Sequence, residues 1–179
     1  MLLDSFMEHE IYGHFGNERS ETILGMKNNF PSIAEFRRGV IAFRKREKRD
    51  AMYKVATKLI KDSWGNHQEV ADGLGVLLLT WNNALYRYGI FDFDKLEKFL
   101  SEHHKEVNAY SKRNLLDWVE QDDSEVKVLF DKLMGALISK GKDKKLRRSP
   151  VAVAKAWHLL APEFFPLWDG EIARSHFIT

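Results

Sequence analysis

Apolar residues recur every three or four positions along much of the chain, which is the spacing of a helix with one buried face. The first such stripe follows Ser32, which together with Glu35 has the form of a capping box. The apolar positions of this stripe are Ile33, Phe36, Val40, Phe43, Ala51, Val55 and Leu59. We therefore expect one long helix over residues 32–62, or two helices with a break near residues 49–50.

A second stripe predicts a more buried helix over residues 70–85, which ends before Gly89. Capping residues predict that later helices begin at Asp94, Ser111, Ser124, Ser149-Pro150 and Asp169-Gly170. Only residues 105–111 and 141–149 have the composition of loops, and no segment alternates apolar and polar residues as a strand would. The expected fold is therefore all-α, with residues 1–179 forming a single compact multi-helix domain.

The composition is that of a globular protein, with 44% hydrophobic and 30% charged residues. The absence of cysteine excludes disulfides, thiolate zinc sites and cysteine-held iron–sulfur clusters, and it fits a cytoplasmic setting. The longest apolar stretch, near residues 74–79, is too short to cross a bilayer, so we expect no membrane association. The first four residues lack a basic region, and we expect no signal peptide.

Basic residues are concentrated in two segments, although the net charge of the whole chain is only +2. These residues are Arg37, Arg38, Arg44, Lys45, Arg46, Lys48 and Arg49 in the first segment, and Lys140, Lys142, Lys144, Lys145, Arg147 and Arg148 in the second. An acidic stretch over residues 117–125 lies between them. The two basic segments are either solvated surfaces or contacts for a polyanion such as DNA.

The histidine spacing argues against a metal site. His9 and His14 are five residues apart, whereas two ligands on one helical face are four apart, and the adjacent His103 and His104 point in different directions on a helix. The chain also lacks the glycine-rich loops that bind nucleotides. We therefore expect no metal ion and no cofactor.

The segment from Ser149 to Arg174 carries the most specific pattern in the chain. It contains Ser-Pro-Val-Ala-Val-Ala-Lys and, further on, Phe-Pro-Leu-Trp-Asp-Gly-Glu-Ile-Ala-Arg. This segment resembles the helix-hairpin-helix DNA glycosylases, the group of endonuclease III, adenine glycosylase and 8-oxoguanine glycosylase. Their hairpin reads L-P-G-V-G-x-K, followed by F-P-x-x-D-x-x-V-x-R. Pro150 matches the proline of that hairpin, while Val151 and Val153 stand where the family has glycines.

The resemblance implies a DNA-repair hydrolase that excises a base and acts as an abasic-site lyase. Lys155 falls on the position of the amine nucleophile, and Asp169 falls on the position of the assisting carboxylate. An amine attacks the sugar only in its neutral form, which a semi-buried site beside other cations favours. The residues expected to contact the extruded base are Asn82, Asn83, Trp157, His158 and Trp168. Those expected to contact the DNA backbone are Lys144, Lys145, Arg147 and Arg148.

Two other functions fit the same residues. A helical module could bind nucleic acid through its basic segments without catalysis, in which case Lys155 would be dispensable for binding. A helical protein-interaction subunit could instead use the acidic stretch at residues 117–125 as its partner surface. Asp169 would then simply cap the last helix, and the aromatic residues near it would belong to the core.

Overall fold

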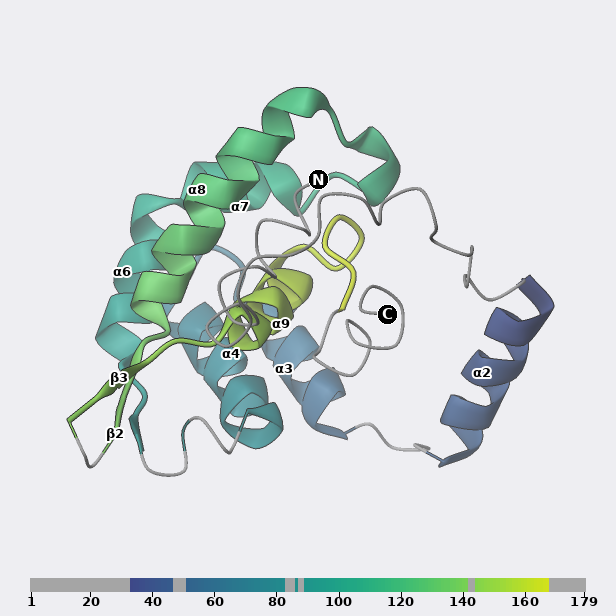
Figure 1. Ribbon diagram of the computed structural model, residues 1–179, viewed down its shortest axis with the longest axis horizontal. Coiled ribbons are helices and arrows are strands. Elements are labelled where there is room, and N and C mark those ends of the chain that lie inside the picture. Colours follow the sequence, from purple (N-terminus) through teal and green to yellow (C-terminus); the bar gives the residue numbers. More distant parts are fainter. Residues whose placement is uncertain (1–32, 47–50, 83–85, 87–88, 142–143, 168–179) are drawn as a thin grey trace, which may run out of the picture. The chain divides into compact units, whose positions relative to one another are not determined.

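The computed structural model describes residues 33–46, 51–82, 86, 89–141 and 144–167. Contacts divide the chain into two compact units, residues 1–50 with 171–179, and residues 51–170. Of the first unit the structure describes helix α2 (Ile33–Arg46; Figure 1). Arg37, Arg38 and Lys45 are exposed on this helix. The expectation of a single domain over the whole chain stays a prediction.

The second unit is mostly helical, which confirms the predicted all-α class (Figure 1). Its elements are α3 (Ala51–Asp62), α4 (His67–Trp81), β1 (Gly89–Ile90), α6 (Phe93–Glu102), α7 (His104–Tyr110), the 3₁₀ turn η3 (Leu115–Asp117), α8 (Glu120–Ala136), β2 (Ser139–Gly141), β3 (Leu146–Arg147) and α9 (Pro150–Leu160). Helix α9 contacts α3, α4 and α8 and is the central element of this unit. No helix in the described part of the chain has the length and apolar character needed to span a membrane.

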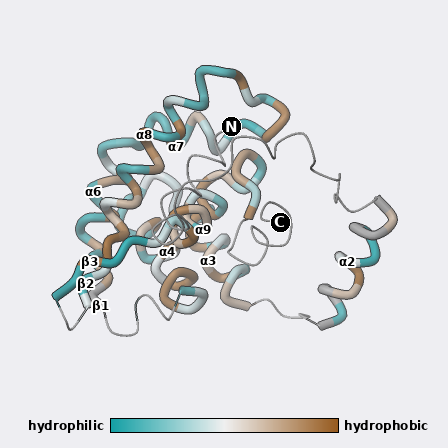
Figure 2. Tube along the Cα trace, viewed as in Figure 1, coloured by the Kyte–Doolittle hydropathy of each residue, from teal (hydrophilic) through white to brown (hydrophobic). Residues whose placement is uncertain are grey.

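Helix α9 begins where the sequence predicts. The Ser149 side chain accepts a hydrogen bond from the amide of Ala152, and Pro150 occupies the first turn, where no amide donor is needed. The helix buries the following side chains: Ala152, Val153, Lys155, Ala156, Trp157, Leu159 and Leu160. The apolar character of α9 stands out in Figure 2. Burial on nearly every side holds α9 in one orientation.

An aromatic cluster surrounds the inner face of α9. The Trp157 ring lies 4.8 Å from that of Phe165 and 6.4 Å from that of Tyr110, between ring centroids. Trp118 stacks on Phe164 at 5.2 Å, and Phe164 is fully buried. These large side chains fill the space between α7, α9 and the segment after α9, and they supply much of the buried apolar area.

Helices α3 and α4 approach each other closely at Gly73. A Cβ atom at this position would lie 2.7 Å from Cγ1 of Ile60 and 3.4 Å from the carbonyl oxygen of Ala56. Glycine therefore permits the tight contact between these two helices, although it costs helix propensity.

The break predicted near residues 49–50 lies outside the described residues; α2 covers Ile33–Arg46 and α3 covers Ala51–Asp62. The predicted buried face of α3 is wrong, because the buried residues lie one position further along the helix than expected. Val55 is 53% exposed, whereas Ala56 and Ile60 are buried, so the helix is rotated relative to the expected face. Tyr53 and Thr57 therefore lie at the edge of the buried face, because residues three and four apart share a helical face.

The segment 141–149, expected to be a loop, contains the last residue of β2 and all of β3, which belong to a small antiparallel sheet with strand order β1-β2-β3. Gly89 pairs with Gly141, and Ser139 pairs with Arg147. Lys144 has a left-handed φ of 60° in the turn between β2 and β3, and its amide donates to the carbonyl of Gly141. The strands are only two or three residues long, which is too short to produce a recognisable alternation.

Several predicted helix boundaries are also wrong. Asp92, not Asp94, caps α6, and α8 begins at Glu120 before the predicted Ser124. The expected loop 105–111 is largely α7, while Ser111 ends that helix and Asn114 caps the 3₁₀ turn. His103 and His104 lie at the junction of α6 and α7. The helix predicted at residues 169–170 lies outside the described residues.

Candidate active site

Lys155 lies in the second turn of α9, and only 9% of the residue is exposed. Its Nζ is 3.5 Å from the carbonyl oxygen of Trp81, the last residue of α4, and 5.7 Å from the centroid of the Trp81 ring. Burial of an amine favours its neutral form, whereas an aromatic ring favours the cation. The position of Lys155 is therefore that of a confined amine at the edge of the core, and not that of a solvated surface lysine.

His158 lies three residues after Lys155, so the two side chains share one face of α9. Its Nδ1 is 2.9 Å from the carbonyl oxygen of Phe165, and its Nε2 is 2.9 Å from the hydroxyl oxygen of Tyr53. A carbonyl only accepts hydrogen bonds, so in the neutral imidazole Nδ1 carries the proton and Nε2 accepts from Tyr53. The carbonyl of Phe165 thus orients a proton acceptor toward the tyrosine hydroxyl.

Trp81 connects these groups. Tyr53 stacks on its ring with a centroid distance of 5.9 Å and an angle of 9°, and Tyr53 also stacks on the His158 ring at 5.8 Å. We call the four residues Tyr53, Trp81, Lys155 and His158 the Lys155 cluster. Only Lys155 is buried in this cluster, and the other three are half-exposed. An amine, a phenol and an oriented imidazole together can supply a nucleophile and a proton relay.

Asn82 adjoins the Lys155 cluster as the residue that ends α4. Its amide donates to the carbonyl of Leu78, and its side-chain Oδ1 is buried without a hydrogen-bond partner among the described residues. A buried acceptor without a partner is costly in a folded protein and is often found where a ligand binds. This geometry keeps Asn82 a candidate contact for substrate.

The remaining predicted site residues divide into two groups. Trp157 is 1% exposed and belongs to the aromatic core with Phe165 and Tyr110, not to the Lys155 cluster. Asn83, Trp168 and Asp169 lie outside the described residues, so their predicted roles stay predictions.

The β2–β3 hairpin leads directly into α9 and carries a high density of positive charge. We call residues 139–148 the basic hairpin. Lys140, Lys144, Lys145 and Arg148 are exposed on it, and Arg147 is half-buried. The predicted backbone-contact residues are thus gathered on one short element, seven residues before Lys155. The other basic segment, around α2, belongs to the other unit.

The predicted acidic surface at residues 117–125 is partly internal. Asp122 is 2% exposed, and its carboxylate forms two hydrogen bonds with the guanidinium of Arg113. These bonds hold the pKa of Asp122 below its ordinary value. The hydroxyl of Tyr110 also donates to Asp122, and burial together with the nearby carboxylates raises the pKa of Tyr110. Asp122 is therefore a structural group of the core and not part of a partner surface.

Tyr53 is the functional candidate that sequence reasoning misses. It lies 105 residues from His158 along the chain, and its contact with that residue depends on how α3 packs on α9. The available signal was the spacing of Tyr53, Ala56, Thr57 and Ile60, which places Tyr53 on the buried face of α3 once the phase of the helix is corrected.

Comparison of the chain with protein-family models, with curated proteins and with solved structures finds no significant match in any of the three. The likeness to helix-hairpin-helix glycosylases accordingly rests on the residues of the segment 149–174 themselves. The geometry of the Lys155 cluster and the basic hairpin is the remaining basis for assigning a function.

Proposed function

We propose that the chain acts on DNA as a base-excision glycosylase or abasic-site lyase, with Lys155 as its amine nucleophile. The observation that carries this proposal is the confinement of the Lys155 amine against Trp81, on the same face of α9 as the Tyr53–His158 hydrogen bond. A surface lysine would have no such neighbours. The basic hairpin, which immediately precedes α9, supplies positive charge for phosphate binding.

In the proposed lyase reaction these groups act one after another. At an abasic site, the lone pair of the neutral amine forms a bond to C1′ of the open-chain sugar aldehyde. Loss of water then gives a protonated Schiff base. A base removes a proton from C2′, the electrons of that bond form a carbon–carbon double bond, and the 3′ phosphate leaves with its bonding electrons. His158 Nε2 is the oriented acceptor that can take up a proton during these steps, and Tyr53 exchanges protons with it. Asp169 remains the predicted assisting carboxylate.

Borohydride trapping tests this proposal. The full chain is incubated with a duplex containing one abasic site, and hydride reduces the Schiff base to a stable amine adduct. We expect an adduct with the native chain, none with Lys155→Ala, and an unchanged yield with Lys98→Ala, which removes an exposed lysine from α6. Circular dichroism establishes that each variant is folded. An adduct that survives in folded Lys155→Ala contradicts the assignment of the nucleophile.

The exposed charge of the basic hairpin favours a second function, a non-catalytic module that binds nucleic acid. Duplex binding measured over a range of salt concentrations separates the two. Salt-sensitive binding without any adduct, and unaffected by Lys155→Ala, identifies the binding module. If the chain binds no duplex at low salt, a protein-interaction role replaces both proposals.

A further inference from the structure

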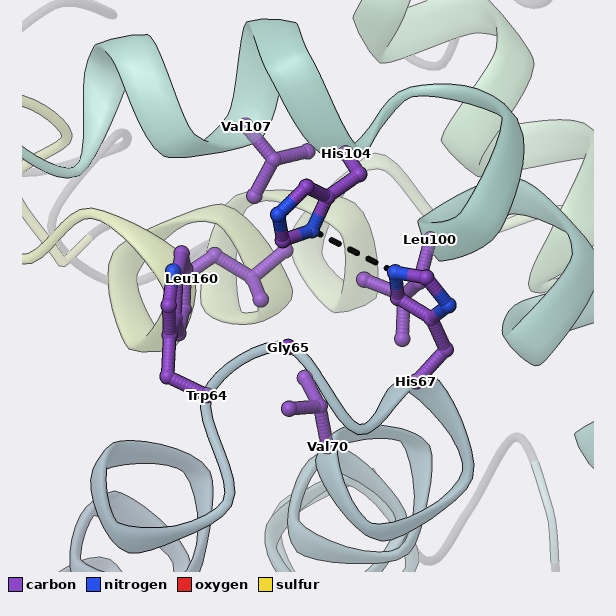
Figure 3. A pocket seen from close by; sticks show the side chains of 8 residues that line it. All are labelled: Trp64, Gly65, His67, Val70, Leu100, His104, Val107 and Leu160. Atoms are coloured by element: carbon purple, nitrogen blue, oxygen red, sulfur yellow. Dashed lines mark hydrogen bonds between the residues drawn. The ribbon is translucent and has the colours of Figure 1, made fainter.

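A pair of histidines lies apart from the Lys155 cluster, in a small pocket between α4 and α7. Nε2 of His67 and Nδ1 of His104 are 3.3 Å apart, and their rings meet edge to face with centroids 5.1 Å apart. Figure 3 shows the two imidazoles turned toward each other across this pocket. Because the two residues are 37 positions apart in the chain, helix packing, and not local spacing, brings them together.

We propose that His67 and His104 are the two protein ligands of a site for a divalent transition-metal ion such as Zn²⁺. Zinc binds histidine nitrogen at about 2.0–2.1 Å, so two such bonds at a tetrahedral angle place the nitrogens about 3.3 Å apart. The observed separation equals this value. Without a metal the two nitrogens share a hydrogen bond across this distance, which is longer than the range of about 2.7–3.2 Å that is usual for nitrogen donors.

The surroundings of the histidine pair fit a small ion. The pocket has a volume of about 10 Å³, which is close to the space that one water molecule requires. Val70, Leu100, Val107 and Leu160 are buried around it, so the imidazole nitrogens are its main polar groups. Both histidines are half-exposed, which leaves a path from solvent.

Neighbouring groups hold the pocket in shape. Trp64 lines the pocket, and its Nε1 donates to Oδ1 of Asn108 on α7 at 3.1 Å. His67 and His104 are each the first residue of a helix, where the helix dipole disfavours a cation. Glu69 and Glu106 lie in the first turns of the same helices, where acidic side chains are favourable.

The two histidines leave other coordination positions open. Among the described residues, no group of three or more histidine, aspartate or glutamate side chains is arranged to hold a metal. Water or an external ligand would therefore complete the coordination sphere, and borderline ions that favour imidazole are the expected occupants. Such a site exchanges its metal more readily than a four-ligand structural site does.

Calorimetric titration of the untagged full chain with Zn²⁺ tests the site. We expect one equivalent to bind, and at least about tenfold weaker binding in both His67→Ala and His104→Ala. His103→Ala is the matched control, because His103 is adjacent in sequence but its ring lies on Phe99, and its affinity should equal that of the native chain. The proposal is overturned if the native chain binds no Zn²⁺, or if neither pocket variant weakens binding.

A measurement on the native chain covers the case in which a pocket variant fails to fold. In a nitrogen-15 spectrum of the imidazoles, one equivalent of Zn²⁺ should shift His67 Nε2 and His104 Nδ1 while leaving His158 in place. Shifts confined to other histidines would overturn the proposal. Neither test involves DNA, so the result is independent of the function proposed for Lys155.

Discussion

Arg113 and Asp122 form a two-point ion pair, with Nη1–Oδ1 and Nη2–Oδ2 distances of 2.8 and 2.6 Å. Asp122 also accepts hydrogen bonds from the Tyr110 hydroxyl and the amide of Val119. Asp122→Ala removes this acceptor, although Tyr110 still donates to Glu125 and Arg113 to the carbonyl of Asp117, and we expect it to lower the free energy of unfolding by about 3 kcal/mol. Urea denaturation measures the change. Asp131→Ala, which breaks an exposed ion pair with Lys127, should cost less than about 1 kcal/mol.

The same ion pair predicts how stability depends on pH. The pKa of Asp122 is lowered in the folded state, chiefly by the hydrogen bonds from Arg113. Its stabilising effect is therefore fully present above the pKa of the unfolded chain, about 4, and is lost as the pH falls through the lower folded value. We expect the unfolding free energy to decrease below about pH 4. The decrease should be smaller in Asp122→Ala, and equal profiles for the two proteins would refute this assignment.

The close packing of α3 on α4 at Gly73 can be tested with a pair of glycine substitutions. In Gly73→Ala the new Cβ meets Ile60, so we expect destabilisation of about 1–3 kcal/mol. In Gly135→Ala, on α8, nothing lies within 4 Å of the added atom, and the gain in helix propensity should stabilise the protein by up to about 1 kcal/mol. Thermal unfolding should therefore shift in opposite directions. A gain in stability from both substitutions would show that Gly73 does not mark a tight helix contact.

The hydrogen bond between Tyr53 and His158 can be removed without removing the tyrosine ring. Tyr53→Phe leaves His158 Nε2 without its donor, and we expect a loss of about 1 kcal/mol in stability together with a changed pH profile of borohydride trapping. Tyr86→Phe is the matched control, because the hydroxyl of Tyr86 donates to the carbonyl of Leu137 and not to His158. It should lower stability and leave the pH profile unchanged. A profile that is equally unchanged in Tyr53→Phe would remove Tyr53 from the proposed relay.

Exposed charges on the basic hairpin should govern DNA binding. If Lys144 and Arg148 each contact a phosphate, the double substitution to alanine should reduce the slope of log affinity against log salt by about 1.8. Lys105→Ala combined with Lys112→Ala removes the same charge from the α7 region, where both side chains are exposed, and should change the slope little. Fluorescence anisotropy with a labelled duplex gives both slopes. Equal slopes for the two double variants would exclude the hairpin as the phosphate contact.

Local sequence signals predicted a helix well where a capping residue is followed by apolar residues at helical spacing. Ser149 and Pro150 mark the start of α9, and the apolar residues Val153, Ala156 and Leu160, which are three or four positions apart, are all buried. In α3, by contrast, Val55 and Ala56 both fit an apolar stripe, and only contacts with α4 decide which of them is buried. The hairpin escaped prediction because its pairing joins β2 to the distant β1 as well as to β3.

Only part of the candidate site could be predicted, because only some of its residues lie close together in the sequence. The spacing of Lys155 and His158 puts them on one helical face, so sequence alone brings two of the four cluster residues together. Trp81 and Tyr53 reach them through the packing of three helices, which no local pattern encodes. The His67–His104 pair was missed for that reason too, since each histidine looks unremarkable within its own segment.

Because the basic hairpin continues directly into α9, its positively charged residues lie at a fixed distance from Lys155. From Ser149 to Lys155 the helix advances about 9 Å along its axis, at about 1.5 Å per residue. Because α9 is buried on nearly every side, this spacing cannot stretch without disturbing the core. If the proposed function holds, a strand bound at the hairpin meets the Lys155 amine at this one separation, so the position of the hairpin contact would decide which nucleotide can react.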